Sequence, residues 1–309
     1  MDEKQEPEER QYLQPEQVMP WIEAAQSGRL NADVLEHLMP PREGSSLRPN
    51  ADSDPFKNMA WWSYGYLEAA ADHLLLWADY AAPPKFHPDS EVTHTLRPAF
   101  TLARATIESA AQAIWILSPE EQIDRVRRYV QLATWDLDEQ TKAAESPEGR
   151  AVLQARRDEL FAGMGITRRQ WRPPKYLEMI REAAEFMTIG DETGFVSPDR
   201  IERVWRSAAG AAHGKRWTEF ELQDRTDAGN GLVLSTPRIE AISEVLEAAS
   251  KYLSAGVILF AIRAGHMEHF GDLWQEATIR LAERITPRDG EVIRRKDVPD
   301  FRVSDVWRE

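Results

Sequence analysis

The chain has 309 residues, of which 42% are hydrophobic and 29% charged, so it can bury a substantial core and is neither disordered nor collagen-like. It contains no cysteine, which excludes disulfide frameworks, cysteine-ligated metals and thiol catalysis and fits a reducing compartment. No run approaches the ~18 apolar residues of a membrane span, and the N-terminus lacks the layout of a signal peptide. We therefore expect a cytoplasmic protein that does not contact a membrane.

The formal net charge of −14 is unevenly distributed along the chain. Residues 146–216 form its one basic block, with 13 basic and 10 acidic residues. Such a block is either a phosphate-facing surface in an acidic protein or a solvated helix face, and composition alone does not separate the two.

Residues 1–55 predict an acidic N-terminal appendage. Two short helices are expected over 15–27 and 31–39, followed by a linker rich in Pro, Ser and Asp. We expect the main domain to span residues 56–285 and a C-terminal arm to span 286–309.

The main domain has the apolar periodicity of several long helices. The segment 95–117 is apolar nearly all round, which is typical of a helix at the centre of a bundle. Ser118-Pro119-Glu120-Glu121 has the pattern of a capping box with proline at the first helical position. Helices are expected over 59–80, 95–117, 118–144, 174–188, 239–264 and 273–285, with a further helix that starts at Pro198.

A short β-hairpin is expected at about residues 216–235. Trp217–Leu222 alternates with a period of two, residues 227–231 are turn formers, and Leu232–Leu234 is a second short run. The predicted fold is therefore all-α, an up-down helical bundle with a short β-hairpin insertion.

One segment carries the candidate chemistry, from Arg203 to Lys215. A spacing of seven residues places Arg206 and His213 on one helix face, and only Ser, Ala and Gly lie between them, so another chain segment can approach closely. The alternative is a tightly packed helix that Gly214 ends in a left-handed conformation, with His213 near the negative end of its dipole.

Two stretches, RATIESAAQAIWIL from Arg104 and WRSAAGAAHGKRW from Trp205 with its following hairpin, resemble a family of actinobacterial helical proteins and, through it, the HEPN superfamily. The HEPN signature is an arginine followed, within two helical turns, by a histidine on one bundle helix, and Arg206 and His213 match it. In HEPN ribonucleases Asn, Asp or His usually follows the arginine, whereas Ser207 stands here.

The resemblance implies a HEPN-like bundle and a metal-independent endoribonuclease of toxin or antiviral-defence type, without a cofactor. His213 would act as general acid or base on the ribose 2′-hydroxyl, Arg206 would stabilise charge on the phosphorane, and Ser207 would orient either group. The site would lie at a homodimer interface, with RNA as substrate and an antitoxin or other protein as partner. Residues expected to contact substrate are Arg203, Lys215, Arg216, Trp205 and Trp217.

Several alternatives stay open from the residues alone. Glu108 or Asp72 is a candidate for orienting His213 across the bundle, although Glu108 also has the spacing of an ion pair with Arg104. Trp205 and Trp217 are either core residues or base-stacking residues. The Glu-x-x-His pairs of bundle metal sites are absent, so no metal is expected. The competing function is a non-catalytic helical binding or scaffold module.

Overall fold

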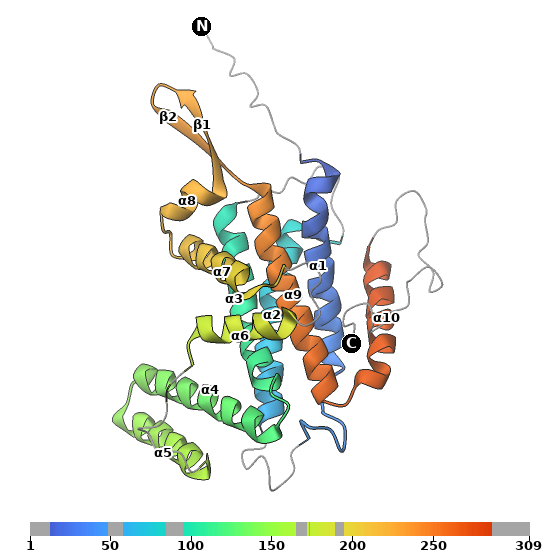
Figure 1. Ribbon diagram of the computed structural model, residues 1–309, viewed down its shortest axis with the longest axis vertical. Helices are drawn as coiled ribbons and strands as arrows, with labels where there is room; N and C mark the ends of the chain where they lie inside the picture. Colours follow the sequence, from blue (N-terminus) through green and yellow to red (C-terminus); the bar gives the residue numbers. More distant parts are fainter. Residues whose placement is uncertain are drawn as a thin grey trace.

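A computed structural model describes residues 13–48, 58–84, 95–164, 172, 174–188 and 195–285, in which the chain is mostly helical with a small two-stranded antiparallel sheet (Figure 1). The N-terminal residues 1–12, part of the predicted linker and the predicted C-terminal arm 286–309 lie outside the described residues. In chain order the elements are α1 (Pro15–Glu36), α2 (Met59–Ala81), α3 (Leu96–Leu117), α4 (Gln122–Ala143), α5 (Pro147–Met164), α6 (Tyr176–Thr188), α7 (Pro198–Ala212), α8 (Trp217–Leu222), β1 (Gln223–Gly229), β2 (Leu232–Pro237), α9 (Ile239–Arg263) and α10 (Met267–Arg284).

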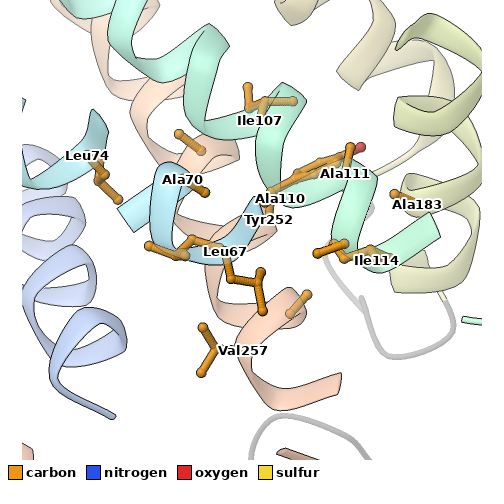
Figure 2. Close-up of a cluster of buried hydrophobic side chains, with 14 of the residues drawn as sticks. Leu67, Ala70, Leu74, Ile107, Ala110, Ala111, Ile114, Ala183, Tyr252 and Val257 are labelled. Atoms are coloured by element: carbon orange, nitrogen blue, oxygen red, sulfur yellow. The ribbon is translucent and has the colours of Figure 1, made fainter. Parts of the chain in front are cut away.

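Helix α3 is the centre of the bundle, as its apolar sequence predicts. It packs against α2, α6, α7 and α9, and its Ile107 and Ile114 are fully buried. Figure 2 shows these two side chains gathered with Leu67 of α2 and Tyr252 of α9. The Tyr252 hydroxyl donates a hydrogen bond of 2.7 Å to the backbone oxygen of Ile180, which ties α9 to α6. The all-α expectation is thus confirmed.

The N-terminal segment differs from the expectation of an appendage with two short helices. Residues 15–36 form one helix, α1, which packs on α2 and α9 and buries Trp21 and Leu35 in the common core. Asn31, at the expected break, donates hydrogen bonds from Nδ2 to the Ser27 backbone oxygen and to Ser254 Oγ of α9. The polar residues that resemble a helix break therefore form a contact between helices.

The link between α3 and α4 differs from the predicted capping box. No capping box forms at Ser118: α4 begins at Gln122, and Ser118 instead caps the C-terminus of α3. The backbone oxygens at that end need donors. Arg263 donates to the oxygens of Leu117, Ser118 and Pro119, and the buried Arg125 donates to those of Pro119 and Glu120.

The β-hairpin is confirmed, but its first strand lies further along the chain than predicted. β1 pairs with β2 in antiparallel register, with Gln223 opposite Pro237 and Thr226 opposite Leu234. The expected first strand, Trp217–Leu222, is the short helix α8. Thr218 and Leu222 are its buried residues, and their spacing of four is helical rather than alternating.

Helix α9 is, within the described chain, the one helix long and apolar enough to cross a membrane. Its most apolar window is 72% buried inside the bundle. This burial fits the core helix of a soluble protein, because a core helix is also apolar all round.

His266, which precedes α10, predicts a loss of stability in mild acid. The side chain is 8% exposed, its Nε2 lies 3.3 Å from the backbone oxygen of Pro40, and burial lowers its pKa below the usual 6.5. As the pH decreases below 6.5, the unfolded chain binds more protons than the folded chain. The free energy of unfolding therefore decreases as the pH decreases, until the pH lies below the folded-state pKa as well.

We expect His266→Gln to remove this part of the pH dependence, measured by urea unfolding from about pH 7.5 to 5. Identical profiles for wild type and His266→Gln would contradict the assignment.

Candidate functional site

Arg206 lies on the exposed face of α7 and reaches back towards the start of that helix. Its Nε donates a hydrogen bond of 2.8 Å to Glu202 Oε1, one turn earlier. The other oxygen of Glu202 accepts a bond of 2.5 Å from Arg181 of α6, which also contacts Asp199. Hydrogen bonds from Arg206 and then Arg181 lower the pKa of the Glu202 carboxyl. Arg206 is thus engaged in a carboxylate network between α6 and α7.

His213 ends α7 and has a different set of partners. The exposed ring places Nε2 3.1 Å from the Arg104 guanidinium of α3. Because a guanidinium only donates hydrogen bonds, Nε2 is the acceptor in this contact. Arg104 donates in turn to Glu108 Oε1 over 2.7 Å, and Trp205 Nε1 donates to the same oxygen over 2.8 Å.

This geometry separates the two predicted orienting residues. Glu108 reaches His213 only through Arg104, so it positions the imidazole indirectly. Asp72 is an exposed residue of α2, and among the described residues no hydrogen bond or ion pair joins it to His213. Arg104, paired with Glu108 as the spacing of four predicted, is the link that the sequence analysis did not assign to the site.

A shallow groove runs beside α7, and Arg206 lines it whereas His213 does not. One hollow of about 460 Å³ adjoins a second of about 420 Å³, and both share Arg203, Ser207 and Glu221. We call the two hollows together the α7 groove. Charged residues of both signs line the groove. The basic ones are Arg200, Arg203, Arg206 and Arg238, and the acidic ones are Asp199, Glu202, Glu221, Glu240 and Glu244.

The other predicted site residues divide between this groove and the end of α7. The Arg203 side chain is 68% exposed, and Trp217, 42% exposed, lines the groove beside Arg206. Lys215 and Arg216 are exposed in the turn after His213. Trp205 is half-buried against α3, where its bond to Glu108 makes it a packing residue. Arg206 and His213 are therefore not brought together within one chain.

Gly210 explains the run of small residues between Arg206 and His213. A Cβ at this position would lie 2.5 Å from Thr218 Cγ2 and 2.8 Å from the ring of Trp217. The close approach expected along this face is made by α8, which packs there and holds Trp217 at the groove. Ser207 on the same face is 7% exposed.

Glu108 holds two donors on one oxygen, so Glu108→Gln is expected to destabilise the α3–α7 contact. The substitution removes the charge that faces Arg104, and hydrogen bonds to charged groups contribute about 1.5–3 kcal/mol each. We expect a loss of about that size in urea unfolding. The exposed pair of Glu139 with Lys142 supplies the control Glu139→Gln, for which a change below about 0.5 kcal/mol is expected. An equal loss of unfolding free energy for Glu108→Gln and Glu139→Gln would contradict the stabilising role of the Glu108 hydrogen bonds.

No group of three or more His, Asp or Glu side chains in the described part of the chain is arranged to hold a metal ion. Comparisons with protein-family models, with curated proteins and with solved structures found no match to the chain.

Proposed function

We propose that the protein is a non-catalytic binding module of HEPN-like helical fold, and that it holds a partner protein in the α7 groove. The observation that carries the proposal is the separation of the two motif residues. Arg206 is engaged by Glu202 at the groove, while His213 is held by Arg104 outside it. A single chain that keeps the arginine and the histidine of such a motif apart has the binding surface but does not by itself assemble the acid–base site.

The chemistry of the groove favours a protein over a nucleic acid. Its arginines face a comparable number of carboxylates, and the chain carries a net charge of −14, whereas phosphate backbones require a surplus of cations. Exposed Trp217 beside Arg203 and Arg206 is the residue combination that dominates the energetics of protein interfaces. A cytoplasmic partner protein with charged groups of both signs fits this surface.

A second function, metal-independent RNA cleavage, is supported by one observation. His213 is an exposed imidazole whose Nε2 accepts from Arg104, with exposed Lys215 and Arg216 next to it. An exposed imidazole among cations is suited to proton transfer on a ribose 2′-hydroxyl. In this proposal a homodimer would supply the Arg206 of one copy to the His213 of the other.

The binding proposal is tested by selecting displayed random peptides on the full-length protein. We expect enriched peptides whose affinity falls at least about tenfold, or about 1.4 kcal/mol, with Trp217→Ala. Trp61, 63% exposed on α2, provides the matched control Trp61→Ala, which should retain binding. Peptides that bind equally to the Trp217→Ala variant, or no enrichment at all, would overturn the proposal.

Cleavage is tested separately with the same protein on single-stranded RNA in the presence of EDTA. The binding module predicts intact RNA for wild type, His213→Ala and Arg206→Ala alike. Cleavage by wild type that both folded variants lose would establish the nuclease and refute the non-catalytic proposal.

A further inference from the structure

The β-hairpin projects from the bundle, and all of it except its two end residues, Gln223 and Pro237, is exposed. Figure 1 shows it extending beyond α8, away from the other helices. Every residue from Asp224 to Thr236 is exposed, and the three apolar residues of β2, Leu232, Val233 and Leu234, are 65%, 50% and 60% exposed. A two-stranded hairpin without a packing partner is marginally stable in water. Among the residues that the structure describes, none provides the cover that such an apolar strand usually has.

The two edges of the hairpin differ in chemistry. β1 carries Asp224, Arg225 and Asp227, and charged side chains on an edge strand oppose pairing with another strand. β2, with the sequence LVLSTP, carries no charge. In the described part of the chain β2 pairs with β1 alone, so its outer edge presents backbone N–H and C=O groups beside apolar side chains, which is a template for adding a strand.

We propose that β2 pairs with β2 of a second copy of the chain, antiparallel, around a two-fold axis at Val233. In this register Val233 lies opposite Val233 of the other copy, and Leu232 lies opposite Leu234 in both directions. All three apolar residues then face apolar residues. A shift of the axis to Leu234 would place Val233 opposite Ser235 and Leu232 opposite Thr236, which loses two of these pairs.

The charge of the protein restricts where two copies can meet. Two chains of net charge −14 repel each other, so association is favoured where an uncharged segment stands furthest from the acidic body. β2 is such a segment, because it is uncharged and lies on the projecting hairpin (Figure 1). The result is a four-stranded sheet in the order β1-β2-β2-β1, with a charged strand at each outer edge. This inference is independent of the proposed binding function of the α7 groove.

Because the chain contains no cysteine, single substitutions report the register directly. Opposite residues of antiparallel strands have Cα atoms about 4.5–5.5 Å apart, within the ~4.4–6.8 Å range of a disulfide, whereas residues offset by two lie about 7–8 Å apart. We expect full-length Val233→Cys to form covalent dimers under mild oxidation. Leu232→Cys and Leu234→Cys should cross-link poorly alone and efficiently when mixed. Thr226→Cys on β1 should stay monomeric on denaturing gels.

Sedimentation equilibrium provides the second measurement. Val233→Lys places two like charges opposite each other, and we expect it to raise the dimer dissociation constant at least about tenfold. The control Thr226→Lys, on the other strand of the same hairpin, should leave it unchanged. A monomeric wild type, a dimer that Val233→Lys leaves intact, or cross-linking without preference for position 233 would each overturn the proposal. A monomeric wild type would mean that β2 is available to an extended peptide of another protein. A dimer that Val233→Lys leaves intact would mean that the two copies meet at another surface.

Discussion

Gly256→Ala is expected to destabilise the bundle by about 1–3 kcal/mol, although alanine is the better helix former. Gly256 lies inside α9 where it crosses α2. A Cβ there would lie 2.5 Å from Leu67 Cδ2 and 3.6 Å from Ile114 Cγ1, and both of these side chains are fully buried. The core around Leu67 would have to shift, and a close-packed interior resists that shift. Urea unfolding measures the loss.

Removing the obstructing side chain should reverse the sign of this effect. Leu67→Ala alone is expected to cost about 2–5 kcal/mol because it leaves a cavity. In that background Gly256→Ala adds a methyl group to the vacated space and gains helix propensity, so we expect a neutral or stabilising effect.

Gly65, also in a helix, provides the control for the double-mutant cycle. A Cβ at Gly65 would meet nothing within 4 Å, so Gly65→Ala should stabilise by about 0.5–1 kcal/mol in either background. The same cost for Gly256→Ala with and without Leu67 would show that the two residues do not compete for one space.

The sequence predicted long, continuously apolar helices well, because their apolar segments are longer than a strand. Helices α2, α3 and α9 begin and end within a few residues of their predicted bounds. The polar helix α5 was not predicted, since it has little apolar periodicity. Helix α1 was predicted as two helices, over 15–27 and 31–39, whereas Ser27 and Asn31 at this junction bond to Ser254 of α9, more than two hundred residues away.

The candidate site was harder to predict because side-chain partners decide it. Helical spacing places Arg206 and His213 on one face, but it does not reveal that Glu202 draws one towards the start of α7 while Arg104 of α3 holds the other. One signal for the missing element was present: Arg97 and Arg104 share the same seven-residue spacing on α3. Arg97 pairs with Glu219 of α8 over 2.6 Å, so this face of α3 meets the end of α7 and α8.

Gly210→Ala is expected to displace α8 and to weaken the α7 groove without altering any residue that lines it. The new methyl group would conflict with Thr218 Cγ2 and with the Trp217 ring, and we expect a loss of about 1–3 kcal/mol in stability. Thr218 is 2% exposed and donates from Oγ1 to the Lys215 backbone oxygen over 2.7 Å, so α8 is anchored at this point. Hydrogen exchange of the α8 amides should accelerate more than that of α9.

The companion variant Thr218→Ser separates a steric cause from a general loss of stability. It keeps the hydroxyl that bonds to Lys215 and removes the methyl carbon closest to position 210, so Gly210→Ala combined with Thr218→Ser should recover part of the lost stability. The same pair should recover part of any peptide affinity that depends on Trp217, because the indole is held at the groove by this packing. Exchange in α8 that is unchanged by Gly210→Ala would mean that α8 does not depend on its contact with α7, and the groove would then lose its structural basis.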